Sequence, residues 1–284
     1  NGNLYIKKGD LLDKIGQARR SLHFYLCAAE LDPKDSRAFS GQGQAFFDLK
    51  RYERSLACYQ MAIKLNPNEC ELYFSAGEVL DFLDRSKEAI IYFAKSLELN
   101  SEYLPSLHAM GNVLFQMGKP KQAVHFYEEA IKTNPDDLDL HVDKGVALDS
   151  LERYYEALSS FEEALKLDPT DSNAFAWKGE ILLSLGRISE ATAIFEQVLS
   201  SDPKNMQAYK GKGLCLQEKG RYYEALHCYD TALTHGRTCD ILYSRGVVLL
   251  ELRRKSEAIE CLNQSLEINP DYEPALEALL KTLQ

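Results

Sequence analysis

Residues 172–205 read SNAFAWKGEILLSLGRISEATAIFEQVLSSDPKN, and this stretch contains the pattern that decides the fold. Gly179 lies in its first half, Ala191 follows twelve residues later, and Phe195 follows four residues after that. Apolar residues recur at spacings of three and four within each half, which predicts two helices of about a dozen residues each. Gly186 lies between the halves, where glycine can take the left-handed conformation that ends a helix. The stretch therefore predicts a helix, a tight turn and a second helix.

The same pattern recurs along the whole chain with a period of 34 residues, which is typical of a repeat protein. Successive glycines at this position are 34 residues apart, except that the last follows after 33: Gly9, Gly43, Gly77, Gly111, Gly145, Gly179, Gly213 and Gly246. The residue twelve positions later is always Ala or Ser, and the residue four further on, which we call the ring position, is large: Tyr25, Tyr59, Phe93, Tyr127, Phe161, Phe195, Tyr229 and Leu262. Two small residues let the paired helices approach closely while the large side chain fills the space beside them.

A single pair of helices cannot bury its apolar face, so the pairs must stack against one another. We expect one domain over residues 1–284 that contains eight repeats: 2–35, 36–69, 70–103, 104–137, 138–171, 172–205, 206–238 and 239–272. Residues 273–284 are predicted to form a capping helix. Its apolar stripe, which we expect to cover the end of the stack, consists of Leu276, Leu279, Leu280 and Leu283.

The sixth repeat carries a family resemblance in six residues: Phe175, Gly179, Leu182, Ala191, Phe195 and Pro203. These residues resemble the tetratricopeptide repeat, and the match covers almost the whole chain. The resemblance implies an all-α fold, a right-handed superhelical α-solenoid of helix-turn-helix repeats. It indicates little about function, because this fold serves many unrelated roles.

The charge and composition exclude several classes of protein. The chain has 33 Lys and Arg against 43 Asp and Glu, a formal net charge of -10, so its surface is poorly suited to nucleic acid or to an anionic membrane. No apolar run approaches the roughly 20 residues that span a bilayer. The seven cysteines are odd in number and scattered, which indicates free thiols in a reducing compartment. We expect the cytoplasm, with the nucleus as the alternative.

Catalytic and cofactor motifs are missing from the sequence. The six histidines are spread over different repeats and do not converge, and no Cys-x-x-Cys motif is present. The glycines follow the repeat period and are not clustered in a phosphate-binding loop. We therefore expect no enzyme activity, no catalytic or metal-binding residue, and no cofactor.

The resemblance implies where a partner would bind. In this family the first helices of the repeats line a concave groove, and the exposed positions lie six and three before the glycine and one, four and five after it. The acidic residues at these positions are Asp10, Asp13, Asp48, Glu71, Glu78, Asp81, Asp139, Asp149, Glu180, Glu218, Asp240 and Glu251, against the basic residues Lys14, Arg37 and Lys210. An acidic groove favours a basic partner segment, although the same charges could form only a solvated surface.

Aromatic residues at these positions gather in the second to fourth repeats. The candidate partner-binding residues are Phe47, Phe74, Glu78, Asp81, Phe82, His108, Asn112, Phe115, Asp149, Glu180, Lys210 and Tyr243. Exposed aromatic side chains of this kind act as anchors at protein interfaces. The alternative is that some of the phenylalanines pack between adjacent first helices.

The sequence as a whole favours a non-catalytic scaffold or adaptor that binds a protein or peptide segment in its groove, anchored in the second to fourth repeats. Two alternatives belong to other classes of protein. The chain could be the substrate-recruiting segment of a larger multi-domain enzyme or assembly. It could also be a scaffold that associates with itself through the exposed ends of the solenoid.

Overall fold

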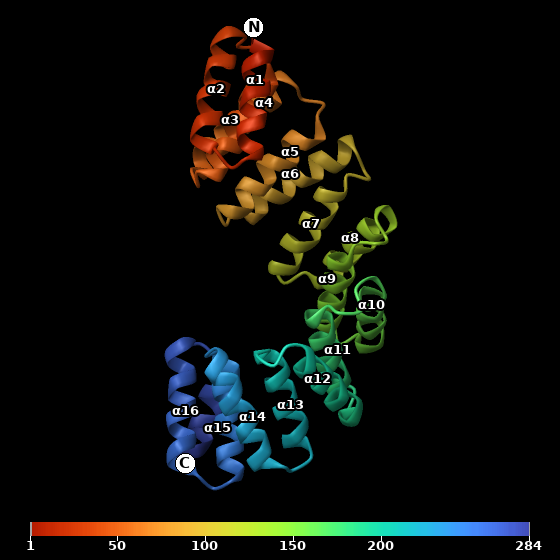
Figure 1. Ribbon diagram of the computed structural model, residues 1–284, viewed down its shortest axis with the longest axis vertical. Helices are drawn as coiled ribbons and strands as arrows, with labels where there is room; N and C mark the ends of the chain where they lie inside the picture. Colours follow the sequence, from red (N-terminus) through yellow and green to blue (C-terminus); the bar gives the residue numbers. More distant parts are fainter. Residues whose placement is uncertain (1, 284) are drawn as a thin grey trace. The chain divides into compact units, whose positions relative to one another are not determined.

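The computed structural model describes residues 2–283, and it contains seventeen α-helices and no β-strand within that range (Figure 1). Asn1 and Gln284, at the ends of the predicted solenoid and capping helix, lie outside the described residues. The helices are α1 (Gly2–Lys14), α2 (Ala18–Leu31), α3 (Ser36–Asp48), α4 (Tyr52–Leu65), α5 (Cys70–Phe82), α6 (Ser86–Leu99), α7 (Leu104–Gln116), α8 (Pro120–Thr133), α9 (Leu138–Asp149), α10 (Tyr154–Leu167), α11 (Ser172–Ser184), α12 (Ile188–Ser201), α13 (Met206–Glu218), α14 (Tyr222–His235), α15 (Cys239–Glu251), α16 (Lys255–Ile268) and α17 (Glu273–Leu283). This all-helical array of repeated pairs confirms the predicted fold class.

The chain divides into two compact units, Asn1–Ala147 and Leu148–Gln284, and α9 contributes to both. Within each unit, an odd-numbered helix packs against the even-numbered helix that follows it, and that helix packs against the next odd-numbered one. The odd-numbered first helices also contact each other, as α5 contacts α7 and α13 contacts α15. First helices of neighbouring repeats therefore line a shared face in each unit.

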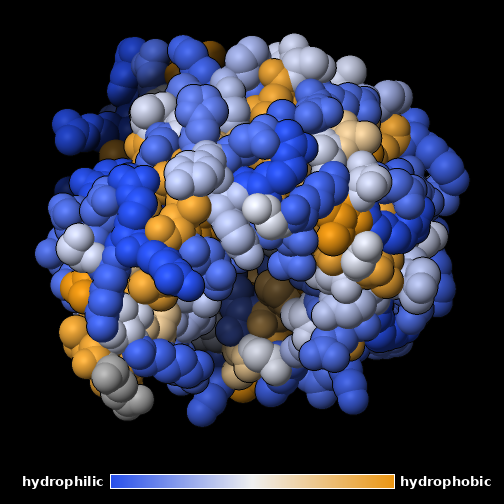
Figure 2. Space-filling view, turned by 90° about the horizontal axis from the view of Figure 1, so that it is seen from below, coloured by the Kyte–Doolittle hydropathy of each residue, from blue (hydrophilic) through white to orange (hydrophobic). Residues whose placement is uncertain are grey.

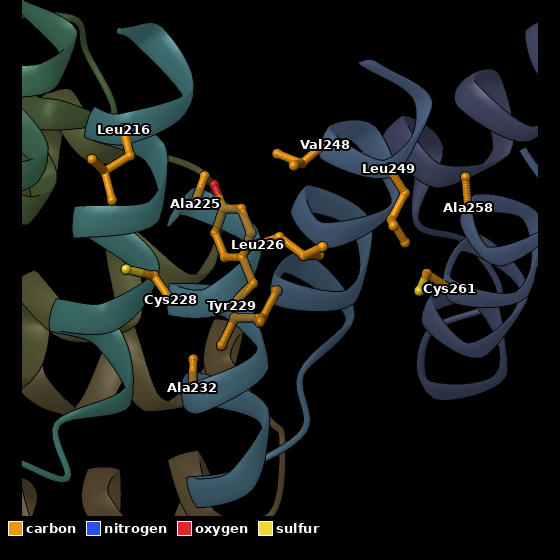
Figure 3. Packing of buried hydrophobic residues seen from close by; sticks show 11 residues of the cluster. Leu216, Ala225, Leu226, Cys228, Tyr229, Ala232, Val248, Leu249, Ala258 and Cys261 are labelled. Atoms are coloured by element: carbon orange, nitrogen blue, oxygen red, sulfur yellow. The ribbon is translucent and has the colours of Figure 1, made fainter. Parts of the chain in front are cut away.

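The close approach of paired helices depends on the glycine of each first helix. A Cβ atom added to Gly179 would lie 2.6 Å from Cζ of Phe195, the fully buried ring of the same repeat, so no larger residue fits there without a shift. The seventh and eighth repeats share a core of this kind in α13 to α16, which includes Tyr229 at the ring position and Ala225 at the small position (Figure 3). Outside such cores, apolar residues reach the surface in patches separated by polar ones (Figure 2).

The turn inside each repeat requires a left-handed residue at one fixed position. Four repeats place glycine there, with φ of 69° to 71°: Gly16, Gly118, Gly186 and Gly220. The other four place a non-glycine residue there, with φ of 56° to 59°: Lys50, Asp84, Glu152 and Arg253. The left-handed glycine predicted between the two helices is confirmed, and the other four residues adopt the same conformation at a steric cost.

Ion pairs join the second helix of one repeat to the first helix of the next along the C-terminal part of the chain. They are Glu128 with Lys144 at 3.1 Å, Glu162 with Lys178 at 3.0 Å, Glu196 with Lys212 at 2.9 Å, and Asp230 with Arg245 at 2.7 Å. We call these four pairs the ion-pair ladder. The first three repeats have Leu26, Gln60 and Ala94 at the acidic position of the ladder. This charged junction between neighbouring repeats therefore occurs in only part of the chain.

The final helix corrects one prediction. α17 packs on α15 and α16 through Ala275 and Thr282, whereas Leu276, Leu280 and Leu283 stay exposed. The expectation that all four leucines of the stripe face the stack was wrong, because only Leu279 among them is partly buried. Ala275 and Thr282 occupy the repeat positions of Ile241 and Val248, which are buried in the eighth repeat, so α17 keeps the register of a first helix. The exposed leucines occupy positions that face the second helix in a complete pair.

Candidate functional site

A groove between α5 and α7 collects six of the predicted site residues. It has a volume of about 300 Å³ and lies entirely within the N-terminal unit. The predicted residues that line it are Phe74, Glu78, Asp81, Phe82, His108 and Asn112, joined by Phe93, Pro105 and Ala109. We call this site the α5/α7 groove. Phe74, Glu78 and Phe82 lie four residues apart on α5, so they share one face of that helix. The packing of α7 beside α5 places this face in the groove.

Phe82 provides the exposed aromatic surface of the α5/α7 groove, since its side chain is 57% exposed. Phe47 of the preceding repeat packs against it edge to face at a centroid distance of 4.9 Å, and Tyr52 stacks on it at 5.5 Å. These two neighbours hold the ring in place beside the groove. An aromatic ring that is fixed yet open to solvent can accept an apolar group at low entropic cost.

The other predicted phenylalanines are partly buried. Phe74 packs against Phe93 at 6.0 Å and against Tyr103 at 5.8 Å, so it forms the wall of the groove. Phe115 is half-buried and is not among the lining residues. The alternative that some phenylalanines serve packing therefore describes Phe74 better than Phe82.

Glu78 and Asp81 give the groove its charge. Burial raises the pKa of Glu78, and the nearby Asp81 raises it further. Burial also raises the pKa of Asp81, with a smaller contribution from Asp84. Within residues 2–283, neither carboxylate has a lysine or arginine partner in an ion pair. Two partly desolvated negative charges therefore lie side by side without a compensating positive charge.

Equivalent polar residues in other repeats receive a hydrogen bond from the ring position. The Tyr25 hydroxyl is 2.9 Å from Asp10 and 2.8 Å from Asp13, and the Tyr127 hydroxyl donates to Asn112 at 2.8 Å. The third repeat has Phe93 at the ring position, so its carboxylates receive no such bond. Whether a carboxylate receives this hydrogen bond follows from the choice of Tyr or Phe at the ring position, a signal in the sequence that was not used to predict the site.

His108 forms the polar wall of the groove on α7. Its Nε2 atom lies 2.7 Å from a carboxylate oxygen of Asp143 on α9. That hydrogen bond raises the pKa of His108, and burial opposes the shift. His108 therefore already has an anionic partner, Asp143, and does not compensate the charges of Glu78 and Asp81.

The C-terminal unit contains four of the other predicted residues, Asp149, Glu180, Lys210 and Tyr243, in a different arrangement. The ammonium group of Lys210 lies 3.3 Å from Glu180 and 3.1 Å from Asp240, which come from the first helices on either side. Burial disfavours the charge on Lys210, but the two carboxylates outweigh it and raise the pKa. Burial raises the pKa of Asp149, as does Glu180. Charges on this face are thus partly neutralised within the protein.

Tyr243 lies apart from that cluster. Its ring meets Tyr272 edge to face at 5.7 Å, and it lines a groove of about 800 Å³ with residues of α15 and α17. The twelve predicted residues therefore do not form one site. Six line the α5/α7 groove, Phe47 supports it, and the others are distributed elsewhere.

Residues 2–283 contain no group of three or more His, Cys, Asp or Glu side chains arranged to hold a metal ion. Among the same residues, every helix is too short or too polar to span a bilayer.

Comparison with protein families gives matches to tetratricopeptide repeat models along most of the chain. The matched residues are 36–69, 71–103, 108–172, 150–213 and 239–272. No curated protein matches the sequence. The matches span seven of the eight repeats wholly or in part and agree with the helix pairs of the structure.

Solved structures show the same architecture. A tetratricopeptide repeat protein from Parabacteroides merdae is 17% identical, with a TM-score of 0.78 over 88% of this chain and 99% of that chain. The Cut9 and Hcn1 hetero-tetramer of the APC/C matches at 17% identity, with a TM-score of 0.67 over 99% of this chain and 56% of that chain. PilF of Pseudomonas aeruginosa matches at 20% identity, with a TM-score of 0.59 over 75% of this chain and 97% of that chain. At these identities the likeness shows the fold alone.

The helix pairs, the glycine and ring positions and the family matches all agree. Such repeats generally serve as non-catalytic scaffolds that bind protein or peptide partners, and this fold supports that role. The chain belongs to the tetratricopeptide repeat family, with eight repeats followed by a C-terminal helix.

Proposed function

We propose that this protein is a scaffold that binds a basic segment of a partner protein in the α5/α7 groove. The observation that carries the proposal is the pair of carboxylates, Glu78 and Asp81, which within residues 2–283 have neither an ion-pair partner nor a hydrogen bond from a tyrosine hydroxyl. Partly buried charges without partners are costly in the free protein, so a ligand that supplies the missing charge gains affinity.

The partner segment makes two contacts in this proposal. A lysine or arginine side chain enters the groove and forms charge-assisted hydrogen bonds with Glu78 and Asp81. An apolar residue beside it packs on the exposed face of Phe82, which Phe47 and Tyr52 hold in place. The net charge of -10 speeds the encounter with a basic segment, and added salt slows it.

The proposal includes no catalytic step and no cofactor. The groove combines carboxylates and aromatic rings, its lining residues include no Ser, Thr, Cys or Lys, and its histidine is already paired with Asp143. We place the protein in a reducing compartment, the cytoplasm, on the basis of its seven scattered cysteines.

Arrays of short synthetic peptides test the proposal directly. One set carries a central Lys or Arg next to Leu or Phe, and a matched set replaces the basic residue by Glu or Gln. We expect the protein to bind members of the first set and none of the second. Binding of the best peptide should fall about tenfold in the double variant Glu78→Gln, Asp81→Asn, because charge-assisted hydrogen bonds are lost.

Glu218→Gln is the matched control, since it removes one charge from a first helix in the C-terminal unit. It should leave peptide affinity within about twofold of the wild type, because its charge lies outside the groove. Equal losses in the control and the groove variant would show that only the general acidity of the protein matters. Preference for the acidic or neutral peptides would refute the proposal outright.

A further inference from the structure

The α5/α7 groove is small, and more than half of its lining is apolar. Its volume of about 300 Å³ lies at the lower end of the range for sites that enclose a small ligand, so it suits one side chain and not a helix. Five of its nine lining residues have no polar side-chain group: Phe74, Phe82, Phe93, Pro105 and Ala109. A side chain that enters the groove therefore meets aromatic and aliphatic surface as well as the two carboxylates.

Two aromatic rings lie on either side of one carboxylate. Phe74, Glu78 and Phe82 follow one another at four-residue spacing on α5. An α-helix rises about 1.5 Å per residue, so the two phenylalanines are about 12 Å apart along its axis and Glu78 is midway between them. A cation at the level of Glu78 is then about 6 Å along the axis from each phenylalanine, within the range of cation–π attraction.

Both rings are already held in place by other aromatic side chains. Phe74 packs against Phe93 and Tyr103, at centroid distances of 6.0 and 5.8 Å. Phe82 is held by two aromatic residues of the second repeat. A ligand therefore gains the attraction of the rings without the entropic cost of ordering them.

Hydrogen-bond acceptors are available on one side of the groove only. Glu78 and Asp81 both belong to α5. The other two polar lining residues have partners, since Asn112 accepts a tyrosine hydroxyl at 2.8 Å and His108 is paired with a carboxylate at 2.7 Å. An unmodified lysine ammonium has three N–H donors and is strongly hydrated. Donors that point away from the two carboxylates would face apolar lining, which is unfavourable.

Methylation of the ammonium nitrogen removes these excess donors and keeps the positive charge. A dimethylated ammonium retains one N–H donor for a carboxylate and has two methyl groups for the rings. Aromatic rings attract methylated ammonium groups through the cation–π interaction. The acceptors on one side and the rings on the others match this pattern of one donor and two methyl groups.

We propose that the α5/α7 groove binds a methylated lysine of the partner, with dimethyllysine as the preferred form. This inference rests on the proposed function, because the methylated lysine is the basic residue of the partner segment. Its N–H donates to Glu78, and Asp81 adds a second compensating charge. Its methyl groups lie against Phe74 and the part of Phe82 that lines the groove.

Five peptides that differ at a single residue test the preference. That residue is unmodified, monomethylated, dimethylated or trimethylated lysine, or arginine. Titrations at about pH 8 keep the carboxylates charged and the histidine of the groove largely neutral. We expect dimethyllysine to bind about fivefold more tightly than unmodified lysine. Equal or tighter binding of unmodified lysine or of arginine would overturn this inference and leave the proposed function intact, whereas no binding of any peptide would overturn both.

A sixth peptide separates cation–π attraction from apolar contact. It carries the neutral isostere of trimethyllysine, in which a carbon atom replaces the ammonium nitrogen. The two side chains have the same shape, so we expect the neutral form to bind about tenfold more weakly than trimethyllysine. Equal affinities would mean that the groove recognises an apolar shape alone, and the inference would be wrong.

Two protein variants locate the effect in the groove. Phe74→Leu and Phe82→Leu keep an apolar side chain but remove a ring, so each should reduce the ratio of dimethyllysine to unmodified-lysine affinity towards one. The ratio is unaffected by any contact that both peptides lose, and circular dichroism checks that the helices are retained. Tyr223→Leu is the matched control, because Tyr223 is 74% exposed and lies on α14. An unchanged ratio in both groove variants, or an equal fall in the control, would contradict the inference.

Discussion

The third and sixth repeats place a carboxylate at the same position, one residue after the glycine, but they treat its charge differently. In the sixth repeat, Glu180 shares the ammonium group of Lys210 with Asp240. In the third repeat, Glu78 forms no ion pair with any described residue, and a second carboxylate, Asp81, lies on the same helix. Both repeats have phenylalanine at the ring position, so neither provides a tyrosine hydroxyl.

This difference shows how one repeat can be structural while another is open to a ligand. A carboxylate that is paired inside the protein has its charge compensated and offers little to a partner. A carboxylate without a partner costs stability and offers a binding contact. The two units of the chain can therefore share one fold and still divide structural and binding roles between them.

Removal of Lys210 should give the largest effect on stability. Lys210→Met leaves Glu180 and Asp240 as partly buried charges without a partner, and we expect a loss of about 2 kcal/mol in the free energy of unfolding. The urea midpoint, measured by circular dichroism, reports the loss. Glu78→Gln should show no loss, since that carboxylate pays a desolvation cost in the folded state. If both variants lost the same stability, the contrast between the two repeats would disappear.

Phe93→Tyr should convert the third repeat to the arrangement of the first. The new hydroxyl would donate to Glu78 much as Tyr25 donates to Asp10, so the carboxylate would gain a partner within the protein. We expect about 1 kcal/mol of added stability and a several-fold loss of affinity for a basic peptide. Thermal unfolding and peptide titration measure the two effects. Phe195→Tyr in the sixth repeat is the control and should leave peptide binding unchanged.

Acidification should weaken the binding of a basic peptide. Burial raises the pKa of Glu78 and of Asp81, so both lose their negative charge at a higher pH than ordinary carboxyls. Asp143 raises the pKa of His108, so positive charge also appears on the groove wall at a higher pH than usual. Both changes disfavour a basic ligand as pH falls from about 7.5 to about 5. Titrations at several pH values should show a flatter dependence for the double variant Glu78→Gln, Asp81→Asn than for wild type.

The smallest expected effect lies in the turns, where the two units do not differ. Lys50 and Glu152 hold left-handed conformations with φ of 56° and 58°. Replacement of either by Gly should remove the steric cost and raise stability by about 0.5–1 kcal/mol. Thermal unfolding should give equal gains at the two sites. Unequal gains would mean that the two units also differ in backbone strain. The stability difference between them could then not be assigned to charge alone.

The 34-residue period predicted the fold well because every repeat contains the same pattern of small and large residues for a close helix pair. Gly179 and Phe195 identify a close helix pair in one repeat, and seven further copies of the pattern remove the ambiguity of a single one. The orientation of α17 was not predictable from its leucines alone. A leucine stripe indicates an apolar face, but the repeat register places Ala275 and Thr282 at the positions of the buried Ile241 and Val248, and this is the face that packs against the preceding repeat.

The candidate site was predicted as a set of positions and not as a set of interactions. The repeat period brought Phe74, Glu78 and His108 to one groove, because residues at equivalent positions of neighbouring first helices lie side by side. The side-chain partners of these residues could not be predicted from the sequence. The bonds of His108 with Asp143 and of Lys210 with Glu180 depend on side-chain reach between helices, and spacing along the chain does not specify that reach.

The ion-pair ladder has a consequence for protein engineering. Each step connects an acidic residue to a basic residue sixteen or fifteen positions later, so every repeat from the fifth to the eighth presents its neighbour with the same type of junction. Excision of residues 138–171 would bring Glu128 opposite Lys178 and recreate a junction of the same charges. Removal of one repeat in this region would therefore keep the charge pairing at the new junction. The first three repeats lack this standard junction and would each need a matched neighbour.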